Sequence, residues 1–143
     1  MVTRRALLGA GTLLLVGCGP PDEPEVNAAN VWGEQLRVSQ AALAAYPTTS
    51  LRSAAAKRVR ELESLAGATG AAPTATRSLA SALEAERVAL QTHVAAVGEL
   101  EDRASRELLA TLIAGTAEAV AVLRAELGEP PIVDAFPGQR NRP

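Results

Sequence analysis

Glu86 and His93 are the two residues of this chain whose types and positions are best suited to chemistry. Both fall on the apolar stripe of a helix expected near residues 77–97, and carboxylates and imidazoles bind metals and transfer protons. They are seven positions apart, so they lie on one helix face about 10 Å from each other. One helix therefore cannot easily place both on the same metal, although neighbouring helices could add partners to either.

Three interpretations of these two groups are open. In the simplest one, which we expect, the stripe is shifted so that Val94 and Ala82 or Ala89 point inward and both polar groups lie at the boundary of the core. In the second, an internal Glu–Arg or His–Glu pair fixes the register of the helices. In the third, both groups and Glu84 form a metal or small-ligand site, with help from another helix or a second subunit.

The low number of cysteines and histidines restricts other chemistry. Cys18 is the only cysteine and His93 the only histidine, which excludes an intramolecular disulfide and a Cys/His zinc site within one chain. The residues around His93 do not resemble a nucleophile elbow. The sequence therefore predicts no catalytic residue, no metal and no cofactor, and we expect that the protein is not an enzyme.

Four segments that follow residue 30 carry apolar residues at a spacing near 3.5, which predicts four amphipathic helices. The first contains Trp32 and Tyr46 on its stripe, where we expect them in the core, and Pro47 ends it. Thr49 or Ser50 is the expected N-cap of the second segment.

Small residues and caps predict where the remaining segments begin and end. Gly67 and Gly70 end the second segment, and a loop over residues 67–73 leads to a third segment that begins near residues 74–77. Gly98 is expected to cap the end of the third segment, and Asp102 the start of the fourth. Gly128, followed by two prolines, ends the fourth segment.

The expected fold class is all-α, because four apolar stripes joined by short loops can bury one another in an up-down-up-down four-helix bundle. The bundle is predicted to span residues 31–128, and residues 129–143 form an extended C-terminal tail whose Phe136 occupies a groove. The formal net charge is −2, with 14 basic and 16 acidic residues. That balance argues against a nucleic-acid partner, which would require a basic face.

The N-terminus has the three parts of a secretory signal. Arg4 and Arg5 precede an apolar stretch over residues 6–16 that is too short to span a bilayer, which takes about 20 residues. The stretch ends in Leu15, Val16, Gly17 and Cys18, and this tetrapeptide resembles the lipobox of bacterial lipoproteins. The resemblance implies a signal peptide over residues 1–17, cleavage before Cys18, and lipid on the Cys18 thiol.

Residues 3–8, Thr-Arg-Arg-Ala-Leu-Leu, also resemble a twin-arginine export motif, although adjacent arginines occur in ordinary Sec signals as well. Residues 18–30 contain three prolines among acidic residues and are expected to form a flexible tether behind the lipid anchor. The expected location is the extracytoplasmic face of the cell membrane, with the lipid on Cys18 as the membrane contact.

The C-terminal half resembles the end of an uncharacterised ferritin-like domain found in actinobacterial twin-arginine lipoproteins. The segments that carry this resemblance are 83–86 (LEAE), 104–106 (ASR), 123–128 (LRAELG) and 135–138 (AFPG). The resemblance implies a ferritin-like four-helix bundle. The chain departs from the metal-binding pattern of that fold, however, because it has no Glu-x-x-His motif: Leu90 stands three residues before His93.

The leading functional hypothesis is a non-enzymatic, lipid-anchored helical module that binds an envelope protein or has an accessory role. An exposed apolar patch would support it. One alternative is a ferritin-like metal or redox protein with a reduced or intersubunit metal site, against which the missing motif argues. A second alternative is a small-ligand or lipid carrier, which an interior pocket of a few hundred cubic ångströms would support.

Overall fold

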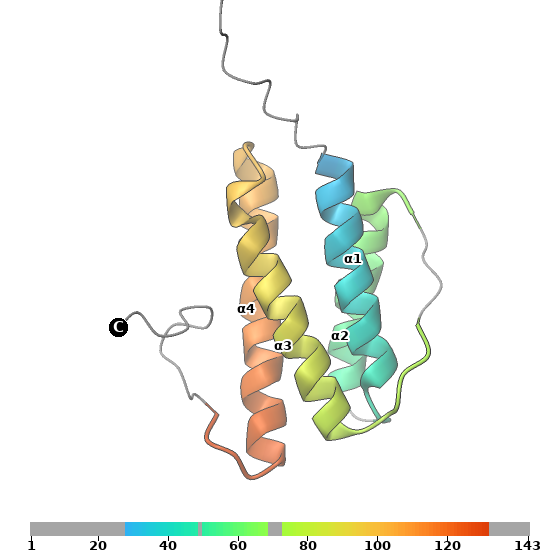
Figure 1. Cartoon of the computed structure of the whole chain (residues 1–143). Coiled ribbons are helices and arrows are strands. Elements are labelled where there is room, and N and C mark those ends of the chain that lie inside the picture. Colours follow the sequence, from blue (N-terminus) through green and yellow to red (C-terminus); the bar gives the residue numbers. More distant parts are fainter. Residues whose placement is uncertain (1–27, 49, 69–72, 132–143) are drawn as a thin grey trace, which may run out of the picture.

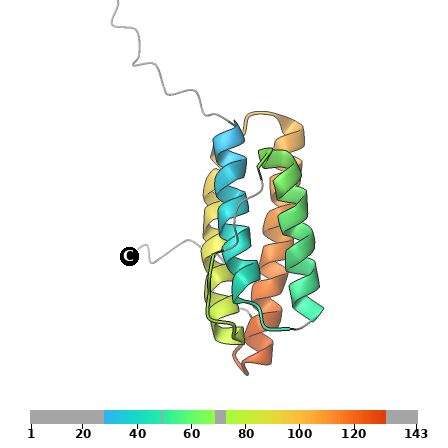
Figure 2. The ribbon, with the colours of Figure 1, turned by 90° about the vertical axis from the view of Figure 1, so that its right-hand side faces the viewer.

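The computed structural model describes residues 28–48, 50–68 and 73–131, and every regular element within these ranges is helical (Figure 1). The α-helices lie side by side in both views (Figure 1; Figure 2) and are α1 (Ala28–Ala45), α2 (Ser50–Ala66), α3 (Leu79–Ala95) and α4 (Arg103–Glu126). A short 3-10 helix, η1 (Ala96–Gly98), continues α3. The predicted all-α class is confirmed. The expected signal peptide, lipidation site and C-terminal tail from residue 132 lie outside the described residues.

The direction of the helices differs from the predicted up-down-up-down order, which is wrong. One apolar cluster contains Trp32 near the start of α1, Leu62 near the end of α2 and Leu109 near the start of α4. A second cluster joins the end of α1 to Ala55 near the start of α2 and Ala82 near the start of α3. Both α2 and α3 therefore begin at the end of the domain where α1 finishes, and they run parallel to each other (Figure 1).

The connection between α2 and α3 explains this order. The third helix begins at Leu79, later than the predicted start near residues 74–77, so the connection covers residues 67–78. A chain of this length reaches roughly 40 Å when extended, which exceeds the length of about 25 Å of the 17-residue helix α2. The Ser78 N–H donates to the Ala45 carbonyl oxygen at 3.1 Å and fixes the start of α3 beside the end of α1. The Ser78 side chain accepts from the Ser81 N–H and caps the helix.

Some of the other predicted helix boundaries are confirmed, and others are wrong. Asp102 caps α4, because its Oδ1 accepts from the Ser105 N–H at 2.8 Å. Gly67 and Gly128 follow α2 and α4 with φ of 62° and 73°, a left-handed conformation that favours glycine. Gly98 does not cap α3 in this way, because the chain continues through η1. At the N-terminal side α1 begins at Ala28, inside the predicted tether of residues 18–30, since two alanines there favour helix.

The four helices do not surround the core equally. Helix α1 packs against α2 and α3, and α3 packs against α4, whereas α2 and α4 stay further apart. Trp32 and Tyr46 are buried, as predicted for core residues. Helix α4 has 24 residues and a mean hydropathy of 1.6 over its most apolar window, so by length and composition alone it could cross a membrane. In the domain it packs along α3 and contributes Leu109 and Leu123 to the two apolar clusters.

Candidate functional site

A cluster of three polar side chains lies between the helices around Glu86. The Glu86 carboxylate on α3 is 1% exposed. Its Oε1 accepts a hydrogen bond of 2.7 Å from the Tyr46 hydroxyl, just beyond the end of α1, and it also forms an ion pair with Nη2 of Arg58 on α2. We call Tyr46, Arg58 and Glu86 the Glu86 cluster. It satisfies a buried carboxylate with one charged and one neutral donor.

Arg58 extends the cluster to the fourth helix. Its Nη1 donates to the carbonyl oxygen of Gly115 on α4 at 3.3 Å. A Cβ added at Gly115 would lie 3.8 Å from Cδ of Arg58, which is ordinary van der Waals contact. One guanidinium therefore contacts α3 and α4 from α2, and the cluster as a whole joins all four helices.

The electrostatics of the cluster follow from burial. Desolvation raises the pKa of Glu86 above its ordinary value, and the Arg58 charge and the Tyr46 hydroxyl oppose this shift. Burial also raises the pKa of Tyr46, and the neighbouring Glu86 charge adds to the shift. The Tyr46 hydroxyl therefore keeps its proton and acts as a hydrogen-bond donor.

His93 forms a second buried contact, to Gln35 on α1. Its Nδ1 lies 2.6 Å from Oε1 of Gln35, whose Nε2 donates to the Val31 carbonyl oxygen at 3.2 Å. Because the amide orientation is set by Val31, Oε1 is an acceptor and Nδ1 must carry the proton. Burial, together with the positive charge of Arg58, lowers the pKa of His93 to about 4. The ring is therefore neutral near pH 7.

Two further buried polar atoms are Nε2 of His93 and Oγ1 of Thr116. Both are buried, and neither has a hydrogen-bond partner among the described residues. The neutral His93 ring with a proton on Nδ1 presents Nε2 as an acceptor. A buried acceptor and a buried hydroxyl without partners each reduce stability, on the order of 1–3 kcal/mol.

The structure overturns the expected boundary position of the polar pair. Ala82 and Ala89 are buried as expected, but Val94 is 40% exposed and both Glu86 and His93 are buried, so the polar pair does not lie at the boundary of the core. Both polar groups can remain inside because partners from α1 and α2 meet them, which is the arrangement of the second interpretation. Glu84 is exposed and pairs with Arg87 at 3.3 Å, so it does not join a ligand set with the other two.

A metal centre would need a different set of side chains. Among the described residues, no group of three or more His, Cys, Asp or Glu side chains is placed to hold a metal ion. The partners of Glu86 and His93 are Arg58, Tyr46 and Gln35, and sequence reasoning assigned none of these to a site. Arg58 follows the apolar Ala55 by one turn, which is the only local signal that could have indicated an inward position.

A groove of about 490 Å³ lies between α2 and α4, where these helices stay apart. Trp32 and Leu112 contribute apolar surface to its lining, and Arg58 and Gly115 are shared with the Glu86 cluster. Leu65 and Leu108 also line it and are 40% and 48% exposed. The groove is thus an apolar slot whose wall includes the polar contact between α2 and α4.

No family model, curated protein or solved structure matches this chain.

Proposed function

We propose that this protein is a bacterial lipoprotein whose helical domain binds an amphipathic helix of an envelope protein in the groove between α2 and α4. The lipobox residues Leu15–Cys18 support the lipid anchor, on the extracytoplasmic side of the membrane. The domain is proposed to be a ferritin-like four-helix bundle, since that fold joins two helical hairpins through one long crossover. The connection over residues 67–78 has this property.

The single observation that carries the binding proposal is the groove itself. Leu65 and Leu108 leave large apolar side chains in contact with solvent at its walls. Apolar surface of this kind on a small domain marks interaction sites more often than chance exposure does when the residues gather in one place. Here the two residues lie on facing helices and line one cavity.

An amphipathic helix matches the shape and chemistry of the groove. Such a helix presents large apolar residues at positions i, i+3, i+4 and i+7, and recognition grooves between helices accept these as a row of anchors. Lys57, Glu61 and Glu118 supply charges of both signs along the lining. The polar flanks of an amphipathic helix can pair with them while its apolar face covers Leu65 and Leu108.

The groove extends to the end of the domain where α1 begins, which is the end that follows the proposed tether. Leu65 follows Leu62 by one turn and Leu108 precedes Leu109, and both of those neighbours belong to the apolar cluster at the start of α1. The lipidated Cys18 is connected to this end through residues 19–27. A partner segment close to the membrane surface would therefore be within reach.

A ferritin-like metal or redox function has less support from the interior. Oε1 of Glu86 already receives the Arg58 guanidinium and the Tyr46 hydroxyl. A guanidinium beside the carboxylate repels a metal cation by like charge. His93 Nε2 is free to accept, but it has no carboxylate partner among the described residues.

A small apolar ligand is the second candidate, because the groove volume falls within the range of about 300–1,000 Å³ that is typical of ligand pockets. An acyl chain would lie against Trp32, Leu62 and Leu112. This candidate differs from the first in the kind of molecule that contacts Leu108, so one experiment addresses both.

The test is site-specific photocrosslinking in cells that process bacterial lipoproteins. A photoreactive amino acid replaces Leu108, and in the matched control it replaces Ala110, which is exposed on another face of α4. A discrete protein adduct from position 108, absent from position 110 and lost on Leu65→Glu, supports the proposal. A lipid adduct with the same pattern favours the carrier. Equal or absent labelling at both positions overturns the groove as a binding site.

A further inference from the structure

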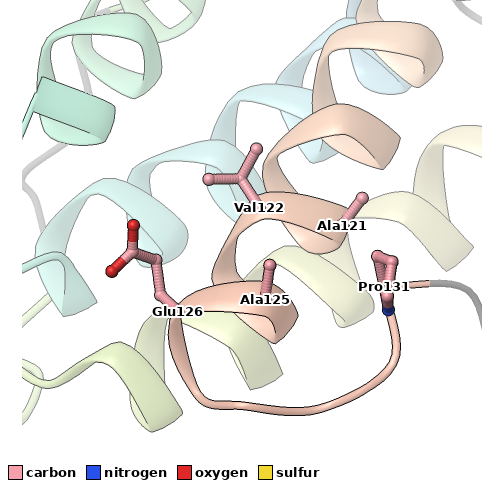
Figure 3. A pocket seen from close by; sticks show the side chains of 5 residues that line it. All are labelled: Ala121, Val122, Ala125, Glu126 and Pro131. Carbon is pink, nitrogen blue, oxygen red and sulfur yellow. The ribbon is translucent and has the colours of Figure 1, made fainter.

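A second hollow lies on the outer side of α4 near its C-terminal end (Figure 3). Its volume is about 530 Å³, and it is lined by Ala121, Val122, Ala125, Glu126 and Pro131. The alanines leave room above the helix because their side chains are short. Helix α4 is apolar along most of its length, and only part of it is covered by the rest of the domain. The hollow is independent of the groove between α2 and α4.

The chain beyond α4 is turned back towards this hollow by a set of specific contacts. Gly128 adopts a φ of 73°, and its N–H donates to the Ala125 carbonyl oxygen at 3.0 Å. The Glu129 N–H donates to the Arg124 carbonyl oxygen at 2.9 Å. These bonds end the helix and reverse the chain, in the manner of a glycine C-cap.

Arg124 then holds the returning chain beside the helix. Its Nε donates to the Pro130 carbonyl oxygen at 2.7 Å, and its Nη2 pairs with the Glu129 carboxylate at 3.0 Å. Pro131 follows directly and forms one wall of the hollow, beside Ala121 and Ala125 (Figure 3). The last described residue therefore already lines the hollow.

The sequence that continues from Pro131 contains apolar residues that could pack on this shallow surface hollow. Ile132 and Val133 are apolar, and Phe136 is the only phenylalanine of the chain. Five further residues reach up to roughly 17 Å when extended, which is about three turns of α4. Covalent attachment gives this segment an effective concentration in the millimolar range, well above that of a separate partner.

We propose that the segment Ile132–Phe136 binds in the hollow on α4, with the Phe136 ring against Ala121 and Ala125. The segment then covers an apolar part of α4 that no other described element covers. The occupant is this chain's own C-terminal segment, and occupation by a second copy or by another protein would be a different result of the test.

The test is nuclear magnetic resonance on a polypeptide of residues 18–143 with Cys18→Ser, which contains every described residue. The chain has one phenylalanine, so ring-proton signals belong to Phe136 without ambiguity. We expect nuclear Overhauser contacts from this ring to the methyl groups of Ala121 and Ala125, and none to the exposed Ala110. The contacts should be lost on Ala125→Glu and kept on the control Ala110→Glu, with the helical spectrum unchanged in both.

Two results would overturn the proposal. One is a Phe136 ring with random-coil shifts and no contact to α4. The other is a contact that appears only between differently labelled copies in a mixed sample, because that would make the occupant a second molecule.

Discussion

Removal of the Arg58 guanidinium should be the most damaging single change in the Glu86 cluster. Arg58→Met keeps most of the side-chain length but leaves the Glu86 carboxylate, which is 1% exposed, with only the Tyr46 hydroxyl as a partner. Breaking a buried ion pair by removing one partner costs about 3–5 kcal/mol. The reverse change, Glu86→Leu, should cost less, since the Arg58 side chain is 15% exposed and borders the groove, where it can turn towards water.

The double variant Arg58→Met/Glu86→Leu separates the ion pair from the packing around it. It removes both charges and leaves apolar groups in their place, so most of the lost stability should return. The Tyr46 hydroxyl would then lack its acceptor, which leaves a residual cost of about 1–3 kcal/mol that Tyr46→Phe should reduce. The assay is urea unfolding followed by circular dichroism, with the free energy of unfolding extrapolated to water.

The pH dependence of Arg58→Met gives an independent check. Without the guanidinium, the pKa of Glu86 in the folded state rises further, because desolvation is then opposed by Tyr46 alone. A carboxyl whose pKa is raised on folding stabilises the folded state as the pH falls through that pKa. The loss in free energy of unfolding caused by Arg58→Met should therefore become smaller as the pH falls. A double variant as unstable as Arg58→Met, or a deficit that does not change with pH, would refute the reasoning.

Two further predictions concern His93 and the glycines. The pKa of His93 falls from 6.5 to about 4 on folding, so the unfolded chain binds a proton first as the pH drops, and the free energy of unfolding declines by about 3 kcal/mol between pH 6.5 and 4. The variant His93→Gln should lose this part of the pH dependence, which urea unfolding at several pH values measures. The same pH dependence in both proteins would contradict the assignment. Gly33→Ala should stabilise the domain by about 0.5–1 kcal/mol, because Gly33 is inside α1 with nothing within 4 Å of an added Cβ. Gly128→Ala should instead destabilise the domain by about 1 kcal/mol, because Gly128 has a φ of 73°. Thermal unfolding in which the melting temperatures of both variants shift in the same direction would refute this contrast.

Local features of the sequence were sufficient to predict the helices. The apolar spacing indicated four of them, Pro47 and Gly128 marked two ends, and Asp102 was identified as a cap. Each of these signals acts within a few residues along the chain, where propensity and capping decide the conformation. The late start of α3 was missed, because the N-cap is Ser78 and residues 73–77 carry no local signal that excludes a helix.

Helix direction and the partners of Glu86 are long-range properties, and the sequence pattern does not contain them. An apolar stripe shows which face is buried, but it is the same for either direction of a neighbouring helix. The Ser78–Ala45 hydrogen bond, which fixes α3 beside the end of α1, joins residues far apart in sequence. In the same way, Tyr46 and Arg58 reach Glu86 across 40 and 28 positions. The expectation of a boundary position failed because the spacing of apolar residues does not show which side chains of the neighbouring helices face Glu86 and His93.

The crossover between α2 and α3 divides the domain into two hairpins, α1–α2 and α3–α4, and the side-chain contacts of Glu86 and His93 run from one hairpin to the other. Tyr46 and Arg58 belong to the first hairpin and Glu86 to the second; Gln35 and His93 are divided in the same way. Each hairpin can begin to form from contacts close in sequence, which is fast. The two hairpins can dock in only one register along their length. A shift of one hairpin by one helical turn, about 5.4 Å, would bury the Glu86 charge without its donors. The polar contacts therefore select the matched alignment of two preformed halves from the many alignments that apolar surfaces alone would tolerate.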